Sequence, residues 1–326
     1  MRTTTARRTS FAALGALALV LPLTACGESA ATASAATSAT APSSSPSPVS
    51  ADGKSADAKS AGVRDGAAAA AFKKLEQKYG ARLGVHAVDT GSGRAVSYHA
   101  DERFAYASTH KAFTAAAILD KYSLEGLGDK SITVGKDVPV GHSPVTSAHV
   151  GQKLTLRQLC EAAVRQSDNG ADNLLVRDLG GPKKLDAYLE GLGDDVTQMN
   201  RYETALTEAT PGDKRDTTTP RAFAKDLRAV TLGAALPEPE RAQLDDWLDE
   251  SPTGTELIRA GVPKEWSVGD KSGAARYGTR NDIAVVRPPG KAPLVVTVMS
   301  KRKKEDADYD DKLVAEAASV VADKLS

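Results

Sequence analysis

Cysteine is almost absent from this chain, since only Cys26 and Cys160 occur in its 326 residues. Cys26 lies in an N-terminal export segment that is described below, which leaves Cys160 without a partner for an intramolecular disulfide. An apolar helical pattern surrounds Cys160, so we expect a buried and unreactive thiol there. Paired cysteines and the His-Glu-x-x-His motif are both missing, and the five histidines are scattered. These absences exclude the common zinc sites, and we expect neither a metal nor any other cofactor.

A net charge of either sign is missing as well. The chain has 42 Lys and Arg residues and 42 Asp and Glu residues, which gives a formal net charge of 0. It contains no basic segment with interleaved aromatic residues, the pattern that is typical of nucleic-acid binding. We therefore expect no nucleic-acid partner.

The first 26 residues have the pattern of an export signal. Arg2, Arg7 and Arg8 precede an apolar run over residues 11–21, which is followed by a Leu-Thr-Ala-Cys segment that ends at Cys26. This segment resembles the bacterial lipobox, in which the thiol is acylated and the cysteine becomes the first mature residue. The pattern predicts an exported protein held by a lipid at Cys26 on the outer face of the cell membrane. The alternative is ordinary secretion with an incidental cysteine, and the sequence does not distinguish general from twin-arginine export.

Residues 27–65 are rich in Ala, Ser, Thr and Pro and have almost no large apolar side chains. Such a segment cannot bury enough apolar surface to offset the entropy of ordering, so we expect a disordered tether. Residues 66–326 have an ordinary globular composition and are numerous enough for one large domain or two closely packed ones.

Strand patterns occur at both ends of the folded region. Alternation and turn signals predict strands at about residues 83–88, 95–98, 282–286 and 294–299. A helix with Phe72 on its apolar face precedes the first pair, and a helix that contains Leu313 follows the last. The long stretch from about Ser108 to Trp247 is mostly helical in pattern. The two chain ends are therefore expected to share one antiparallel sheet, with a separate helical lobe between them and a cleft where the lobes meet.

Three short motifs carry groups suited to acyl transfer: Ser108-Thr109-His110-Lys111, Ser167-Asp168-Asn169 and Lys271-Ser272-Gly273. Ser-x-x-Lys alone is expected about once by chance in a chain of this length, and Ser300 to Lys303 also fits it within a charged surface run. An apolar approach, however, places Ser108 at the start of a helical run, where backbone N–H groups and the helix dipole favour negative charge. Lys111 returns to the same face one turn later, within reach of the Ser108 proton.

The second and third motifs supply groups that complement this serine. Ser167 and Asn169 follow a helix, at a point where side chains can project into a cleft. Ser167 can relay a proton, and Asn169 can bind a substrate amide and Lys111. Lys271 and Ser272 suit a carboxylate, and the glycine after them lets a substrate lie along the backbone.

Taken together, these residues resemble the class A serine β-lactamases over essentially the whole folded region. The match is collinear and includes further segments of the chain: Ser143 to Thr146, Asn173, Arg201-Tyr202-Glu203, Pro211 to Pro220 and Tyr277 to Asp282. The resemblance implies an α/β fold, with a five-stranded antiparallel sheet that is flanked by helices and built from both chain ends, plus an all-α lobe. It implies one domain over residues 66–326, whose α/β lobe comprises residues 66–106 and 251–326 and whose all-α lobe comprises residues 107–250. It also implies a monomer that acts on small β-lactam substrates.

The resemblance further implies a role for each site residue. Ser108 attacks the lactam carbonyl while the N–H groups of Ser108 and Ala274 bind the oxyanion. Ser167 delivers a proton to the departing ring nitrogen, and Glu203 activates the water that releases Ser108. Either Lys111 or Glu203 is the base of the acylation step, and the sequence leaves this open. Substrate binding falls to the residues Asn169, Lys271, Ser272, Gly273, Ala274 and Arg280.

Support for Glu203 is implied as well. Asn173 is expected to support the position of Glu203. A partly buried, bidentate ion pair between Arg201 and Asp216 is expected to close the Ω-loop around Glu203. Breaking such a pair would cost several kcal/mol, about the amount typical of a buried pair that loses one partner.

Some positions depart from the family pattern. The family has an asparagine that holds the hydrolytic water where this chain has Thr207, so we expect hydrolysis that is weakened rather than abolished. His110 replaces a phenylalanine and His142 an aromatic residue at the cleft mouth; we expect a packed and a surface histidine, respectively. The family's disulfide pairs are absent.

Three functions fit these observations. The first is a β-lactam hydrolase that protects its host from antibiotics. The second is a penicillin-sensitive D-alanyl-D-alanine peptidase or transpeptidase, which would lack a deacylating glutamate such as Glu203 in an Ω-loop. The third is a non-enzymatic lipid-anchored trap or sensor that stays acylated, a function that Thr207 keeps open.

Overall fold

The computed structural model describes residues 54–326, with side chains from Gly66 onward. The expected export signal, Cys26 and most of the expected tether lie outside the described residues. Helix α1 (Lys54–Tyr79) begins within the expected tether, so residues 54–65 are helical rather than disordered. This part of the chain is rich in alanine and lysine, whose high helix propensity favours extension of the helix in the N-terminal direction.

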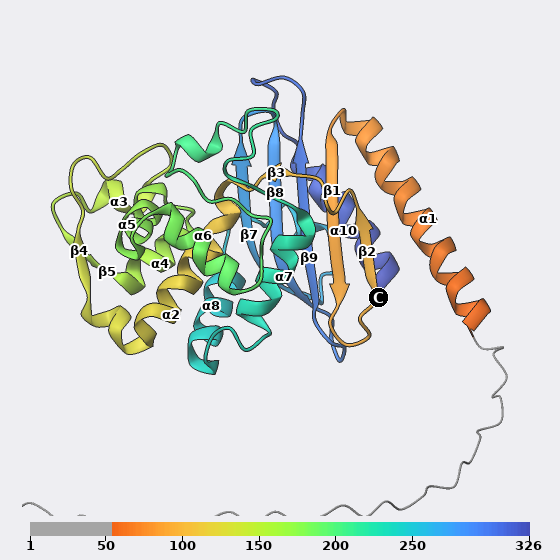
Figure 1. Ribbon diagram of the computed structural model, residues 1–326, viewed down its shortest axis with the longest axis horizontal. Coiled ribbons are helices and arrows are strands. Elements are labelled where there is room, and N and C mark those ends of the chain that lie inside the picture. The colour runs from red at the N-terminus through yellow and green to blue at the C-terminus, as the bar shows by residue number, and fades with distance from the viewer. Residues whose placement is uncertain (1–53) are drawn as a thin grey trace, which may run out of the picture. The chain divides into compact units, whose positions relative to one another are not determined.

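One antiparallel sheet of five strands lies at the centre of the described region, in the order β2-β1-β9-β8-β7 (Figure 1). Its strands are β1 (Arg82–Asp89), β2 (Ala95–Tyr98), β7 (Ser267–Ala275), β8 (Thr279–Arg287) and β9 (Leu294–Lys301). The pairing of β1 with β9, in which Val85 lies opposite Val298, joins the two ends of the chain. The prediction of an antiparallel sheet built from both chain ends is confirmed.

Helices cover both faces of this sheet (Figure 1). On one face α1, the short α9 (Ile258–Gly261) and α10 (Asp311–Leu325) bury an apolar layer that includes Phe72, Leu83 and Val296. On the other face α7 (Pro220–Thr231) packs against β1, β8 and β9. Helix α8 (Glu238–Asp249) packs against β7 and against α2 (Lys111–Asp129). Helix α7 contacts α2 as well, so α7 and α8 link the sheet to the helical lobe.

The helical lobe lies beside β7, at the left of Figure 1. Besides α2, its helices are α3 (Pro144–Ala148), α4 (Leu156–Arg165), α5 (Asn169–Leu179) and α6 (Pro182–Gly191). Two small two-stranded sheets join β3 (Phe104–Ala105) to β6 (Thr217–Thr218) and β4 (Ser131–Thr133) to β5 (Lys153–Thr155). Among the described residues no helix has the length and apolar character that crossing a membrane requires.

Capping interactions fix where α4 and α5 begin. The Thr155 hydroxyl accepts a hydrogen bond from the Gln158 backbone N–H, and the Gln158 side chain accepts one from the Thr155 N–H. This reciprocal pair is the capping box that starts α4. Asp168 caps α5 by accepting a hydrogen bond from the Ala171 N–H at 2.8 Å. The short connection between the two helices therefore presents Ser167 and Asn169 at a fixed position.

A buried histidine links the turn before α2 to α5. His110 lies in the 3-10 turn η1 (Ala107–His110), and its Nε2 lies 3.0 Å from Oδ2 of Asp172. Both side chains are almost fully buried. The expectation of a packed histidine at this position is confirmed, but its ionic partner was not expected from the sequence.

The two groups set each other's charge. Burial acts to lower the pKa of His110, but the nearby Asp172 carboxylate outweighs it and the pKa is raised above 6.5. Burial acts to raise the pKa of Asp172, but His110 outweighs it and the pKa is lowered below 3.8. The ion pair therefore stabilises the fold fully between pH 3.8 and 6.5. This contribution is lost as the pH falls through the Asp172 pKa or rises through the raised His110 pKa.

Replacement of His110 by phenylalanine should strand the buried Asp172 carboxylate without a counter-charge. We expect the free energy of unfolding, measured by denaturant titration near pH 6, to fall by about 3–5 kcal/mol. Addition of Asp172→Ala removes the stranded charge and makes room for the larger ring, so the double variant should be more stable than His110→Phe alone. A double variant that is less stable than the single one would show that Asp172 is not stranded by the first change.

Candidate active site

Ser108 lies in the tight turn η1 between β3 and α2, where β7 approaches it closely. A Cβ atom at Gly273 would lie 3.0 Å from the Ser108 backbone nitrogen and 3.1 Å from the Tyr106 carbonyl oxygen. Only glycine lets β7 pack this closely against the turn. The Lys271-Ser272-Gly273 motif lies within β7. Its glycine makes room for the backbone of η1.

Two charged groups meet at the Ser108 hydroxyl. Lys111 Nζ donates a hydrogen bond to Ser108 Oγ at 2.9 Å, and Ser108 Oγ donates one to Glu203 Oε1 at 3.2 Å. Lys111 Nζ also lies 3.0 Å from the same Glu203 oxygen, and both side chains are fully buried. Lys111 donates two further hydrogen bonds, to Asn169 Oδ1 at 2.6 Å and to the Ser167 carbonyl at 3.0 Å. The structure therefore brings together, within hydrogen-bond distance, residues that are up to 95 positions apart.

Asn173 holds the backbone of Glu203 in a two-way contact. The Glu203 N–H donates to Asn173 Oδ1 at 2.9 Å, and Asn173 Nδ2 donates to the Glu203 carbonyl at 2.8 Å. The second carboxylate oxygen, Glu203 Oε2, is buried and has no hydrogen-bond partner among the described residues. It therefore keeps its full capacity to accept a hydrogen bond.

The loop that carries Glu203 is closed by Asp216. This fully buried carboxylate lies 2.5 Å from Arg201 Nε and accepts hydrogen bonds from the Arg201 N–H and from the Tyr106 hydroxyl, each at 3.0 Å. Burial, followed by the Asp216 charge, raises the pKa of Tyr106 well above its ordinary value. The ion pair was expected to be bidentate, which is wrong: Arg201 Nη1 contacts Glu208 instead. Asp216 gains its remaining bonds from the backbone and from Tyr106, which ties the end of the loop to the strand before Ser108.

Ser167 and Lys271 come from different elements and are in direct contact. Lys271 Nζ donates to Ser167 Oγ at 3.1 Å and to the Ser272 carbonyl at 2.7 Å. Burial, and then the positive charge of Lys111, lowers the pKa of Lys271 to about 7. Ser167 has a left-handed backbone conformation with φ of 54°. A non-glycine residue adopts this conformation at a cost of order 1 kcal/mol, and such strain is often found at functional sites.

Arg280 follows the turn between β7 and β8 and lies opposite Ala274 in the strand pairing. Its Nε donates to Asp311 Oδ1 at 2.6 Å, and its guanidinium lies over the Tyr309 ring at 4.9 Å. Arg280 is thus held at the same end of β7 as the Lys271 motif.

Sequence reasoning missed several residues that hold this site. Asp168 accepts hydrogen bonds from the Thr146 N–H and hydroxyl as well as capping α5, so it joins α3 to α5. Asn281 donates to the Ala105 carbonyl at 2.7 Å and thereby ties β8 to the strand that leads to Ser108. The Ser272 hydroxyl donates to Thr253 Oγ1 at 2.9 Å. Asp168 and Asn281 belong to the recognised motifs, but nothing in the local pattern indicates Thr253.

Within residues 66–326, no group of three or more His, Cys, Asp or Glu side chains is placed to hold a metal ion. The predicted lipid site, Cys26, lies outside the described residues. Cys160 is buried and free, and burial raises the pKa of its thiol far above the usual range, as expected for an unreactive thiol.

Comparisons with known proteins agree with this geometry. Residues 67–325 match the model of a family described as the β-lactamase enzyme family. A β-lactamase from Amycolatopsis lactamdurans is 52% identical over 261 residues, which cover 80% of this chain and 86% of that protein. A β-lactamase from Bacillus amyloliquefaciens is 51% identical over 254 residues, or 78% of this chain and 83% of that protein.

A solved structure gives the same result. The class A β-lactamase from Clostridium kluyveri superimposes with a TM-score of 0.78 at 46% sequence identity, covering 79% of this chain and 98% of that chain. The motifs, the sheet built from both chain ends and the group of side chains at Ser108 are thus accompanied by close similarity over nearly the whole described region. The chain belongs to the β-lactamase enzyme family, as a serine enzyme of class A.

Proposed function

We propose that this protein hydrolyses the β-lactam ring of penicillin- and cephalosporin-type antibiotics through an acyl-enzyme on Ser108, and so protects its host from them. The observation that carries this proposal is the contact of Ser108 Oγ with both Lys111 and Glu203, at 2.9 and 3.2 Å. A hydroxyl needs an adjacent base to become a nucleophile, and an acyl-enzyme needs an activated water to be released.

In the acylation step, Ser108 Oγ forms a bond to the lactam carbonyl carbon, and its proton passes to the buried pair of Lys111 and Glu203. Because these two groups contact the same oxygen and each other, they act as one unit in removing this proton. The N–H groups of Ser108 and Ala274 stabilise the oxyanion. The carbon–nitrogen bond of the ring then breaks, and Ser167 delivers a proton to the departing nitrogen. The hydrogen bond from Lys271 to Ser167 supports this proton transfer.

In the deacylation step, Glu203 takes a proton from water as the water attacks the ester. The free lone pairs of Glu203 Oε2 and the Asn173 contacts that fix its backbone support this role. The Thr207 hydroxyl donates to the Thr204 carbonyl at 2.7 Å, so it can only accept a hydrogen bond from the water. An asparagine amide in this place could also donate, and deacylation is therefore slower here than with asparagine.

Substrate binding uses the carboxylate that penicillins and cephalosporins carry. This carboxylate is bound by Lys271, Ser272 and Arg280. Asn169 binds the side-chain amide of the substrate, and Gly273 lets the substrate lie along β7. Arg280 is held by Asp311 for this purpose.

Outside the catalytic site, we propose export and attachment through a lipid on Cys26, or secretion, with the enzyme acting as a monomer. Two observations support a monomer: the site is complete within one chain, and Val150 and Tyr309 are the only large hydrophobic side chains exposed among the described residues.

The direct test is purified protein mixed with a chromogenic cephalosporin. We expect sustained turnover by the native enzyme. For Glu203→Gln we expect a burst of one equivalent followed by turnover that is about 10²- to 10⁴-fold slower, the usual contribution of a general base, with the acyl adduct on Ser108 seen by mass spectrometry. A long-lived adduct on the native enzyme would instead identify a trap, and no reaction at all would refute the proposal.

Because the pKa of Lys271 is lowered, its titration should affect kcat/KM for substrates that carry a carboxylate and not for substrates that lack one. Lys271 is charged below about pH 7 and neutral above it, so it loses its attraction for an anion as the pH rises. The ratio of kcat/KM for a penicillin to that for its methyl ester should fall about fivefold between pH 7 and pH 8. The ester serves as the control, because titration of other groups affects both substrates alike. A ratio that stays constant over this range would contradict the prediction.

The lipid anchor is tested by fractionation of cells that produce the protein. Cys26→Ala should release active enzyme from the membrane into the medium, because a single residue carries the anchor. Retention of the variant on the membrane would refute the anchor.

A further inference from the structure

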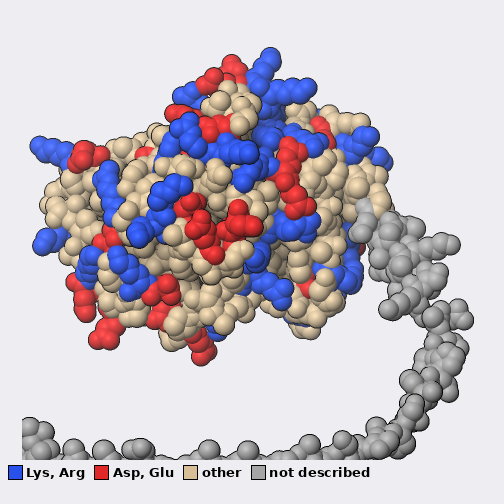
Figure 2. All heavy atoms as spheres, viewed as in Figure 1, with Lys and Arg blue, Asp and Glu red and all other residues tan. Residues whose placement is uncertain are grey.

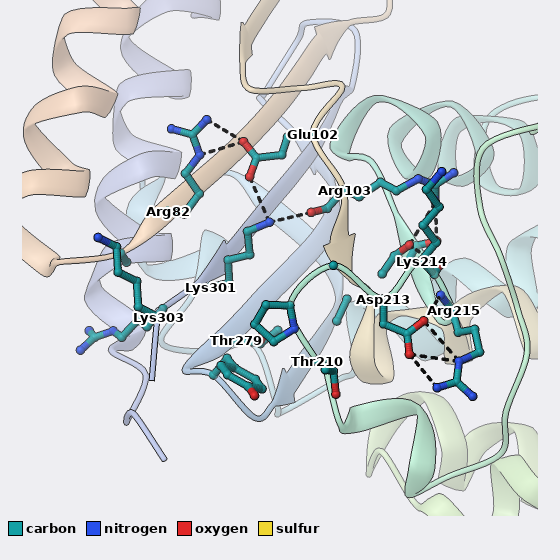
Figure 3. Close-up of a pocket in the computed structure, with 18 of the residues that line it drawn as sticks. Arg82, Glu102, Arg103, Thr210, Asp213, Lys214, Arg215, Thr279, Lys301 and Lys303 are labelled. Carbon is teal, nitrogen blue, oxygen red and sulfur yellow. Dashed lines mark hydrogen bonds and ion pairs between the residues drawn. The ribbon is translucent and has the colours of Figure 1, made fainter. Parts of the chain in front are cut away.

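A second cavity lies away from Ser108. Its volume is about 880 Å³, within the range of about 300–1,000 Å³ that is usual for small-molecule sites. It is lined by the end of α1 and the start of β1, by residues 209–215 of the loop that carries Glu203, and by residues 301–303 at the end of β9. None of the residues proposed above to act on the substrate lines it. Figure 3 shows this cavity.

The lining is strongly basic although the whole chain has no net charge. It contains seven Lys or Arg residues and three Asp or Glu residues. Arg82 and Lys301 both contact Glu102, at 2.6 and 3.0 Å, and Arg215 contacts Asp213 at 2.7 Å. The acidic groups of the lining are thus already engaged by a minority of its cations.

The other four cations of the lining have no carboxylate within ion-pair distance in the part of the chain that is described. They are Arg103, Lys214, Arg302 and Lys303. Arg103 uses its donors on neutral groups instead, the Val196 carbonyl at 2.6 Å and the Thr217 hydroxyl at 3.0 Å. Four uncompensated positive charges around one cavity favour an anionic ligand.

These cations lie at two ends of the cavity. In Figure 3, Lys303 lies at one end, whereas Arg103 and Lys214 lie at the other. Apolar groups of Ala81, Pro211 and other residues complete the lining. A small inorganic anion could not reach both ends or cover this apolar surface. A ligand that satisfies the whole cavity has an anionic group at each end and an apolar part that covers the apolar lining.

We propose that this cavity is a second binding site, for an elongated organic dianion with a carboxylate or phosphate at each end. The site is independent of the proposed hydrolysis. The ligand would contact the Glu203-bearing loop through Lys214 and the end of β9 through Lys303. Because the Arg276 N–H also donates to the Thr207 carbonyl at 3.2 Å, the loop already has one link to this side of the sheet. A bound dianion adds a second link and slows local opening of residues 209–215.

The test uses 1,4-phenylenediacetate as the probe, with phenylacetate and sulfate as controls that lack one carboxylate or the apolar ring. Titration of ¹⁵N-labelled full-length protein should shift the amide signals of Gly80 and Gly212, which line the cavity, more than that of Gly273 beside Ser108. Phenylenediacetate should bind about tenfold more tightly than either control, because it alone satisfies both ends. Hydrogen exchange of amides 209–215 should slow when the probe is bound.

Matched variants separate this site from general attraction to a basic surface. Lys303→Ala and Lys214→Ala should each weaken binding of the probe about fivefold, whereas Lys304→Ala, an exposed neighbour outside the lining, should leave it within about twofold. Equal binding to all three variants, or shifts confined to Gly273, would overturn the site. Equal affinity for phenylacetate or sulfate would overturn the assignment of its ligand. None of these readouts depends on β-lactam turnover, so a failure here is distinct from a failure of the proposed function.

Discussion

Two buried groups of opposite charge, the side chains of Lys111 and Glu203, meet at one serine hydroxyl. Taking either charge alone out of water would cost several kcal/mol, and the pair is tolerated because each ion has a partner at close range. Lys111 adds hydrogen bonds to Asn169 and to the Ser167 carbonyl. The same burial that makes the pair costly also strengthens its electrostatic effect on the Ser108 proton.

Much of the surrounding structure serves to hold this contact. The lysine comes from the first turn of α2 and the glutamate from a loop, so their separation depends on everything that fixes the loop. Asn173 fixes the backbone at Glu203, and Asp216 joins the end of the loop to Tyr106, two residues before Ser108. Buried carboxylates such as Asp216 and Asp168 act here as junctions, because one carboxylate can accept several N–H and O–H groups from different elements.

The sequence predicted the parts of the fold that depend on local pattern. Alternation of apolar residues identified β1 and β9 nearly to their ends, and the three motifs together with the family resemblance identified the residues now found around Ser108. Local pattern does not reveal which buried charges pair. His110 and Asp172 are 62 positions apart, and the division of Arg201 between Asp216 and Glu208 depends on the path of the loop.

Thr253 and the basic cavity were not predicted for the same reason, because both depend on contacts between distant segments of the chain. Thr253 meets Ser272 because the segment after α8 lies against β7, and the basic cavity combines residues from five separate segments. The prediction of disorder in residues 54–65 was wrong for another reason, since composition measures what a segment can bury and not its helix propensity. Alanine, lysine and arginine make up half of residues 54–65, and these residues are helical in the structure.

The central claim, that Lys111 and Glu203 act on Ser108 as one unit, is tested most directly by a double-mutant cycle on the acylation rate. Stopped-flow measurement of acylation by a cephalosporin would compare the native enzyme, Lys111→Ala, Glu203→Gln and the double variant. Direct mutual contact predicts that the double variant is no slower than the slower single variant. If the two losses instead multiply, the residues act independently and the claim is contradicted.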